Sequence, residues 1–378
     1  MRVTFISPDG KCGCGNTLKK CVILGATSLW CAAGAGHLGI VKRLVRAGAN
    51  VNHATKTLST PLRAACFDGR LDIVKYLVRH GADIHKANKY NNTCLMIAAY
   101  KGHLEVVSTF LLDSGARVDE RALCGATALH FAAECGHAAV VCALIDHQAK
   151  ILTNENGMTP LQCAAERARA SVVEILAVRP EVNRAQAIEA YELLGASFAN
   201  DKEYYCLRMA YQYLHRAMAM RYDTRYGLQL KQPADPIPAY DNWKESTTIE
   251  EVEALVGNAH AMHMEGLAVR ERVLGKRCPD LPHPIVFRGA VFADEARFDK
   301  CLALWRHALA LRQHNEVISN TTNVNYNGLK GLTILKIKLC KTKSYLTMYS
   351  WKRNRSKKIK KICVIKYYLL SYFSQDQQ

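Results

Sequence analysis

The sequence predicts an all-α solenoid of stacked helix pairs, and three observations lead to this fold class. A threonine recurs with successive spacings of 33, 33, 34 and 32 residues, at Thr27, Thr60, Thr93, Thr127 and Thr159. Two small residues, usually Ala-Ala, follow each threonine at the same distance, and a glycine follows them in four of the five units. Apolar residues then recur with helical spacing. Such a period is typical of repeat proteins, whose units bury their apolar faces only by stacking.

One unit, residues 25–52, shows how the pattern predicts two helices. Leu29, Ala32 and Ala33 share one face of a short first helix, and Gly36 is expected to end it because the chain reversal needs a positive φ. A second helix follows, with an apolar stripe at Ile40, Val41, Leu44 and Val45. A turn followed by two helices at this period is the signature of ankyrin repeats. We predict five of them within residues 25–180, the fifth carrying Ala168 in place of the glycine.

The period is lost from Asn183, but helical patterning continues through a region that we place at residues 181–316. Ala187–Phe198 and Tyr204–Met220 each predict a helix, and Thr247–Leu274 predicts two. Gln232–Asn242 contains three prolines and is expected to be a loop.

The last part of this region has the alternation of small and large residues found in tetratricopeptide helix pairs. Its members are Gly289, Phe292, Phe298, Cys301, Trp305 and Ala308. A weaker version of the pattern involves Gly195, Phe198, Ala210 and Ala217. We therefore predict a tetratricopeptide-like region after the ankyrin repeats.

The two ends of the chain differ from the rest in composition. Residues 1–24 form an atypical leader without alanine, and residues 317–378 form a basic tail that we expect to be disordered. Ser319–Gln378 holds 13 Lys and Arg against one acid, which accounts for +12 of the net charge of +18. The basic run Lys352–Lys361 would suit nucleic acid or an anionic lipid surface. We favour a tail without designed structure, because the shift in composition is abrupt and no helical stripe spans it.

Neither a metal site nor a cofactor is expected. Cys12, Cys14 and Cys21 lack a second ligand pair at zinc spacing, and the cysteines show no disulfide framework, which indicates a reducing, intracellular compartment, cytoplasmic or nuclear. His260, His263 and Glu265 lack the metalloprotease arrangement and are interpreted as structural charges. No phosphate-binding glycine loop or positioned nucleophile is present, so we expect a non-catalytic protein.

Three stretches together resemble the Fem (feminization) family: Ser59–Gly69, Thr93–His103 and Phe287–Leu309. The resemblance covers about Gly25–Gln313. It implies a substrate-recognition subunit of a Cullin–RING ubiquitin ligase that binds the C-terminal end of target proteins, often ending in arginine, on its ankyrin repeats. It also implies Elongin and Cullin as partners.

Family members have further ankyrin repeats before the matching region, and a second ankyrin block with an Elongin-binding box after it. We therefore expect a truncated or alternatively spliced product, or an imperfect gene model. An ankyrin scaffold that binds partners without ligase coupling is the alternative function, and a nucleic-acid binder acting through the tail is a third.

The resemblance also implies a peptide pocket on the first helices of the repeats. Asp68 resembles the acidic residue that pairs with the terminal arginine, and Phe67, Trp30 and Tyr100 are candidates to line the same pocket. A guanidinium needs a carboxylate to pair with and aromatic faces to stack on. For Asp68 the alternative is a solvated helix-end residue, and for the aromatic residues a place in the core.

Ser59 and Arg63 are candidates to receive the peptide carboxylate, and Glu134 is a candidate to contact the upstream peptide. His130 occupies the usual position of an ankyrin turn histidine, and we expect it to be a hydrogen-bonding spacer rather than a ligand-binding residue.

Overall fold

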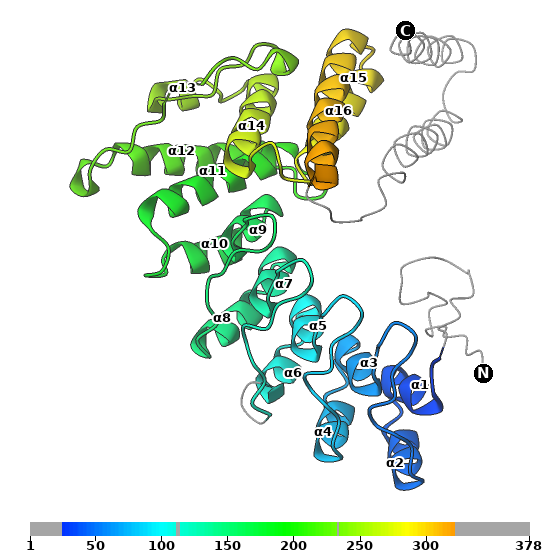
Figure 1. The fold of residues 1–378 in the computed structure, drawn as a ribbon. Helices are drawn as coiled ribbons and strands as arrows, with labels where there is room; N and C mark the ends of the chain where they lie inside the picture. Colours follow the sequence, from blue (N-terminus) through cyan, green and yellow to red (C-terminus); the bar gives the residue numbers. More distant parts are fainter. Residues whose placement is uncertain (1–24, 111–113, 233, 322–378) are drawn as a thin grey trace. The chain divides into compact units, whose positions relative to one another are not determined.

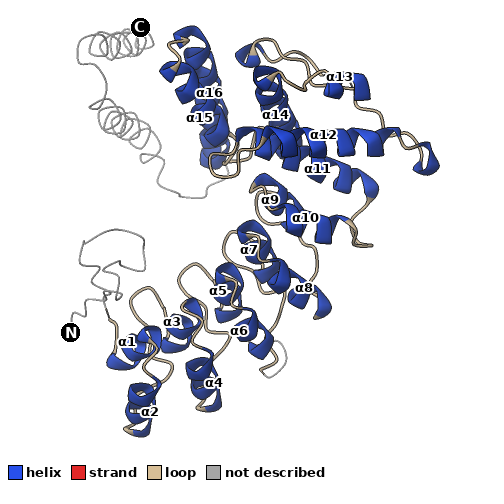
Figure 2. Ribbon diagram, turned by 180° about the vertical axis from the view of Figure 1, so that it is seen from behind, coloured by secondary structure: helices blue, strands red, loops and turns tan. Residues whose placement is uncertain are grey.

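The computed structural model describes residues 25–110, 114–232 and 234–321, and these form helices and loops without a β-strand (Figures 1 and 2). The chain divides into two compact units after Cys278. The leader and the tail from residue 322 onward, with the predictions made for them, lie outside the described residues.

Five helix pairs follow one another along the first unit, so the prediction of an all-α ankyrin solenoid is confirmed (Figure 1). The first helices of the pairs pack on one another in sequence, each against the next. Their bounds are α1 (Ser28–Ala35), α3 (Pro61–Phe67), α5 (Cys94–Lys101), α7 (Ala128–Cys135) and α9 (Pro160–Glu166). The second helices are α2 (Leu38–Arg46), α4 (Leu71–Arg79), α6 (Leu104–Ser108), α8 (Ala138–Asp146) and α10 (Ala170–Ala177).

The recurring threonines begin the first helices. Four of them accept a hydrogen bond at the side-chain oxygen from the backbone N–H three residues later, with N···O distances of 3.2–3.4 Å at Trp30, Arg63, Met96 and Gln162. This bond satisfies one of the N–H groups that a helix start leaves without a partner. The small residues that follow are buried and let adjacent repeats approach closely; Ala33, Ala65 and Ala99 have no exposed surface.

The helical region continues from the repeats through α11 (Arg184–Asn200), α12 (Leu207–Tyr222), α13 (Ile249–Glu253) and α14 (Ala259–Leu274). These match the four predicted helices. Two glycines permit close helix contacts: a Cβ on Gly195 would lie 2.8 Å from the Ala210 carbonyl oxygen, and one on Gly266 would lie 3.0 Å from that of Ala196. The described part of the predicted loop contains one short 3-10 helix, Pro238–Tyr240.

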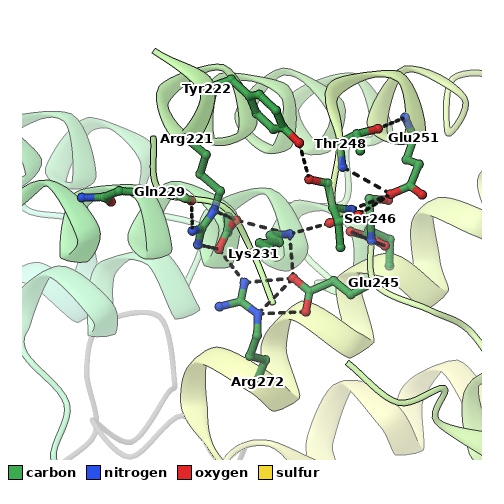
Figure 3. A network of polar contacts seen from close by, with 12 residues as sticks. Arg221, Tyr222, Gln229, Lys231, Glu245, Ser246, Thr248, Glu251 and Arg272 are labelled. Atoms are coloured by element: carbon green, nitrogen blue, oxygen red, sulfur yellow. Dashed lines mark hydrogen bonds and ion pairs between the residues drawn. The ribbon is translucent and has the colours of Figure 1, made fainter. Parts of the chain in front are cut away.

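A buried network of opposite charges joins α11, α12 and α14 (Figure 3). Glu192 accepts hydrogen bonds from Arg221 Nε at 2.8 Å and Nη2 at 3.0 Å, and it also pairs with Arg272 and Lys231. Glu245 bridges Lys231 and Arg272. Burial by itself would raise the pKa of Glu192, but the Arg221 hydrogen bond and the neighbouring cations lower it to about 2. The carboxylate therefore stays charged in the interior because it is fully paired.

A second buried pair ties the last repeat to the helical region. Arg270 on α14 donates from Nη2 to Glu166 Oε1 on α9 at 2.6 Å and from Nη1 to Ser197 Oγ on α11 at 2.6 Å. The side chains of Arg270 and Glu166 are 4% and 9% exposed, so the pair is desolvated. The final repeat is thus covered by helices of another type, as a terminal repeat requires.

The second unit contains α15 (Pro282–Asp294) and α16 (Phe298–Thr321), which pack on each other. The Trp305 side chain packs against Gly289 and donates from Nε1 to the Val286 carbonyl oxygen at 3.1 Å. A Cβ on Gly289 would lie 2.4 Å from that indole nitrogen. The assignment of this pair as tetratricopeptide-like stays a prediction.

The left-handed backbone of Ala168 predicts that a glycine at this position would stabilise the chain. Ala168 has φ 56°, in the left-handed region that glycine adopts at the equivalent position of the other repeats. Left-handed backbone costs a non-glycine residue about 1 kcal/mol or more. We expect Ala168→Gly to stabilise the chain by about 1 kcal/mol, measured as a shift in the midpoint of chemical denaturation.

Gly48→Ala is the matched control for that substitution. Gly48 has φ 84°, and nothing lies within 4 Å of an added Cβ, so this substitution introduces backbone strain without a clash. It should destabilise the chain by a similar amount. If the denaturation midpoint of the Ala168→Gly protein is at or below that of the original chain, the backbone of Ala168 is not strained.

Candidate functional site

The predicted site residues lie on the first helices, or directly before or after one. Trp30, Arg63 and Tyr100 belong to α1, α3 and α5, and Ser59 precedes α3. Phe67 ends α3, with Asp68 directly after it, and Glu134 is in the last turn of α7. Because these helices stack side by side, the residues lie along one succession of repeats.

The first two candidates are in contact. Trp30 Nε1 lies 3.3 Å from Ser59 Oγ and donates a hydrogen bond to it. The indole of the first repeat and the hydroxyl of the second therefore form one polar contact at the start of the candidate surface. Ser59 is half-buried and keeps a hydrogen available for donation.

Arg63 is buried and bridges two repeats. Its side chain donates from Nη1 to the carbonyl oxygens of Asn92 at 2.7 Å and Thr93 at 3.2 Å. Burial lowers the pKa of this guanidinium from its ordinary value, although arginine remains charged in proteins. These bonds fix the cation on the turn of the next repeat.

A pocket of about 170 Å³ lies beside this guanidinium. Its other walls are mainly apolar and come from the third and fourth repeats, and the full lining is Arg63, Asn92, Met96, Ile97, Tyr100 and Phe131. The rings of Tyr100 and Phe131 meet edge to face with centroids 6.3 Å apart. Tyr100 is 44% exposed, so its ring is a surface group and not part of the core. The pocket combines one cation with aromatic and aliphatic walls.

Two further candidate residues, Phe67 and Asp68, lie at the end of α3. Lys101 Nζ lies 4.0 Å from the centroid of the Phe67 ring, which shows that the ring face accepts a cation. Partial burial raises the pKa of the Asp68 carboxyl, and the positive charges of Arg70, Lys101 and His103 counteract this. Asp68 is an exposed carboxylate in a locally basic environment.

Glu134 has a cationic partner of its own. Arg167 Nη2 lies 3.2 Å from Glu134 Oε1, and Arg167 Nε lies 3.0 Å from Glu166 Oε2. Glu166 in turn holds the buried Arg270. The side chain of Glu134 is about two-fifths exposed, so a ligand cation that binds its carboxylate competes with Arg167.

Sequence reasoning missed the residues that fix the ends of the first helices. His103 Nε2 bonds the Phe67 carbonyl oxygen at 3.1 Å, His137 Nε2 that of Tyr100 at 3.0 Å, and Arg169 Nε that of Glu134 at 3.0 Å. The Gly-His pair that recurs in the repeats is the signal that could have found the two histidines, whereas Arg169 follows Ala168 and carries no such signal. Lys101, Met96, Ile97 and Phe131 were also missed, because their proximity depends on the packing of different repeats.

Comparison with known proteins places these repeats in a family. Residues 5–88, 29–122 and 95–186 match the family model described as Ankyrin repeats (3 copies). The protein fem-1 homolog C of Danio rerio is 45% identical over 159 residues, which cover 42% of this chain and 25% of the relative. The protein fem-1 homolog A-A of Mus musculus is 40% identical over 312 residues, which cover 73% of this chain and 47% of the relative.

The chain is a Fem-1 family ankyrin-repeat protein. The matching segment spans about half the length of the mouse relative, 47%, and about a quarter of the zebrafish relative, 25%. The Fem-1 similarity thus reaches beyond the ankyrin repeats into the helical region.

The described part of this Fem-1 family chain shows no group of three or more His, Cys, Asp or Glu residues arranged to hold a metal ion. His260 and His263 are engaged elsewhere: His260 Nε2 pairs with Asp241 at 2.7 Å, and His263 Nε2 contacts the Tyr205 hydroxyl at 3.0 Å. Glu265 is fully buried and accepts from Trp243 Nε1 at 2.7 Å. Within the described ranges, no helix has the length and apolar character needed to cross a membrane.

His130 lies at the base of the fourth repeat and is 2% exposed. Its Nδ1 lies 3.1 Å from the Thr127 backbone nitrogen and 3.0 Å from Thr127 Oγ1, and its Nε2 lies 3.2 Å from the Met158 carbonyl oxygen. A neutral ring that accepts at Nδ1 and donates at Nε2 satisfies all of these contacts. Burial, partly opposed by the bond to Met158, lowers the pKa of His130 to about 4. The ring serves as a spacer between two repeats.

This geometry predicts a pH dependence of stability. An unfolded histidine binds a proton below about pH 6.5, whereas folded His130 does so only near pH 4, so its contribution is complete above pH 6.5 and is lost as the pH falls from 6.5 to 4. The loss should reach about 3 kcal/mol in the free energy of unfolding, from the linkage relation.

His130→Gln is the test variant, because Gln162 occupies the equivalent position in the fifth repeat and accepts from the Thr159 backbone nitrogen at 3.0 Å. Chemical denaturation of both proteins at pH 7 and pH 4.5 should show a smaller loss on acidification for the variant. An equal loss in the two proteins would rule out His130 as its source.

Proposed function

We propose that this chain is a substrate-recognition subunit of a Cullin–RING ubiquitin ligase and binds target proteins that end in arginine. The proposed site lies on the first helices of repeats two to four. Membership of the Fem-1 family supports the class, and the cation held over Phe67 beside Asp68 is the observation that carries the specificity. The chain itself has no catalytic role in this proposal; the partner subunits supply the ligase chemistry.

The terminal arginine side chain binds at Phe67 and Asp68. Lys101 occupies the ring face at 4.0 Å, and a lysine side chain can swing away at little cost. A guanidinium in its place stacks flat on the ring and makes two parallel bonds to the Asp68 carboxylate, which an ammonium cannot do. This chemistry selects arginine over lysine.

The peptide carboxylate binds on the Arg63 side of the surface. The bonds to Asn92 and Thr93 hold the guanidinium in place before the ligand arrives, which reduces the ordering cost of binding. Ser59 offers a hydroxyl donor, Tyr100 supplies an aromatic wall, and the Trp30 indole is bonded to Ser59. Upstream residues of the peptide reach Glu134 in competition with Arg167.

An ankyrin scaffold that binds such peptides without recruiting a ligase is the alternative function. Co-precipitation of Elongin and Cullin subunits with the chain distinguishes the two, since only the ligase receptor retains them. We place either activity in the cytoplasm or nucleus, where a ligase subunit and its targets would meet.

Titration of fluorescent peptides with the full chain tests recognition. Peptides ending in arginine should bind, and the same peptides amidated or ending in alanine should bind at least tenfold more weakly, because each loses a charge-assisted contact worth about 1.5–3 kcal/mol. Asp68→Asn should weaken binding of the arginine peptide by a similar factor.

Asp72→Asn is the charge-matched control, since Asp72 is exposed on α4, in the second-helix row of the same repeat. It should leave the affinity unchanged. Equal affinity for all three peptides, or equal effects of the two substitutions, would contradict the proposed site.

The position of Lys101 predicts that removing its charge strengthens peptide binding. Lys101→Met keeps the aliphatic stem and removes both the ammonium over Phe67 and a positive charge near Asp68. We expect the arginine peptide to bind about 3- to 10-fold more tightly, which corresponds to a cation–π competition of about 1 kcal/mol.

Lys75→Met removes the same charge from the exposed face of α4 and should not change the affinity. Weaker binding by the Lys101→Met protein would show that Lys101 contacts the ligand and does not compete with it.

A further inference from the structure

Four successive hairpin turns form the tips of the repeats, at residues 55–58, 88–91, 122–125 and 154–157. Each turn is closed by a bond from its fourth N–H to its first carbonyl, at N···O distances of 2.8–2.9 Å. Neighbouring turns also bond to each other: Lys89 N donates to the Thr57 carbonyl at 3.3 Å, Leu123 N to that of Tyr90 at 3.0 Å, and Glu155 N to that of Cys124 at 3.0 Å. The tips therefore form one continuous surface with fixed spacing.

Three of these turns expose a large apolar side chain. Leu58 is 48% exposed, Tyr90 52% and Leu123 54%, while the fourth turn carries Glu155 and Asn156 instead. Single exposed apolar residues are common on protein surfaces, but three in adjoining, mutually bonded turns form a patch. We call Leu58, Tyr90 and Leu123 the tip patch.

Leu58 is held in an unfavourable backbone conformation. Its φ is 59°, and the same turn position is occupied by Asn91, Gly125 and Gly157, which tolerate a positive φ. A leucine there destabilises the free chain and gains little burial, since about half of it is exposed. Strain of this kind in an exposed residue points to a contact that is made only in a complex.

Cations flank the tip patch. Lys56 and Lys89 occupy the second position of their turns, and Arg121 directly precedes the third turn. None of the three forms an ion pair with another residue in the described part of the chain. Lys89 Nζ lies 4.7 Å from the centroid of the Tyr90 ring, next to the patch. A partner with acidic side chains beside apolar ones complements this surface.

We propose that the tip patch binds an acidic amphipathic helix of a partner protein, at a site separate from the C-terminal peptide site. Adjacent repeats pack at about 8–10 Å, and two turns of an α-helix advance about 10.5 Å, so apolar residues seven apart match successive tips. Flanking Asp and Glu residues then face Lys56, Lys89 and Arg121. Residues 1–24 and 322–378 contain only Asp9 and Asp376 as acids, so they do not supply such a helix.

Selection from a library of random 16-residue peptides displayed on phage tests this proposal. The peptides are displayed with their C-termini fused to the coat protein, so that they offer no free terminal carboxylate to the peptide site. The immobilised full chain captures binders, and those that also bind the variant Leu58→Asn/Tyr90→Asn/Leu123→Ser are removed. That variant leaves the rest of the sequence unchanged, including the basic run at residues 352–361.

We expect the surviving peptides to carry apolar residues seven apart together with Asp and Glu, and to bind the triple variant at least tenfold more weakly. A control with three exposed apolar residues replaced elsewhere, Ile40→Ser, Val178→Ser and Val256→Ser, should bind them normally. No surviving peptide, or survivors without acidic residues, would overturn the proposal. Titration of the arginine-ending peptide on the triple variant should be unchanged, which keeps the two proposed sites distinguishable.

The single substitution Leu58→Asn distinguishes an effect on stability from an effect on peptide affinity. Because asparagine tolerates the positive φ, the variant should raise the denaturation midpoint while it weakens the selected peptides about threefold or more. A variant that loses binding through misfolding would lose stability as well. Increased stability with unchanged peptide affinity would show that Leu58 makes no contact with the partner.

Discussion

The ankyrin part of the first unit depends on the stacking of one repeat against the next. No single pair of short helices can bury its apolar face, so the repeats supply one another's core. The contacts are backbone-directed as well as apolar: His103, His137 and Arg169 each reach back to a carbonyl at the end of the preceding first helix. These bonds satisfy carbonyl groups that a helix end leaves without partners. The stack is therefore held in register at the same place in each of these repeats.

That register places the candidate site. The carbonyl groups bonded by these three side chains belong to Phe67, Tyr100 and Glu134. The side chains of these three residues are all candidates for peptide contact. Their backbones are fixed by the following repeat, while their side chains remain on the surface. Arg63 is fixed in the same manner, through the carbonyls of Asn92 and Thr93. The scaffold thus fixes the backbone beneath several candidate side chains, which would favour the affinity of the proposed peptide.

In the helical region, buried ion pairs join helices to one another. Glu192 and Glu166 lie in the interior, where an unpaired carboxylate would be strongly destabilising, and each is met by at least one arginine. Because these pairs join helices far apart in sequence, they fix α14 against both α11 and the last repeat. The chain of ion pairs from Glu134 through Arg167 and Glu166 to Arg270 links the candidate surface to that region.

The sequence by itself determined the repeat architecture, because period, threonine caps and small residues are local features that recur. It also placed Asp68, Phe67, Arg63 and Tyr100 on or directly after the first helices. It did not determine which side chains meet: Lys101 over Phe67, Arg167 on Glu134, and the left-handed backbone of Leu58 were decided by the tertiary structure. The physical reason is that these contacts join residues about one repeat apart, or depend on a turn geometry that the neighbouring turns impose. Their existence follows from how adjacent repeats pack, which no local pattern records.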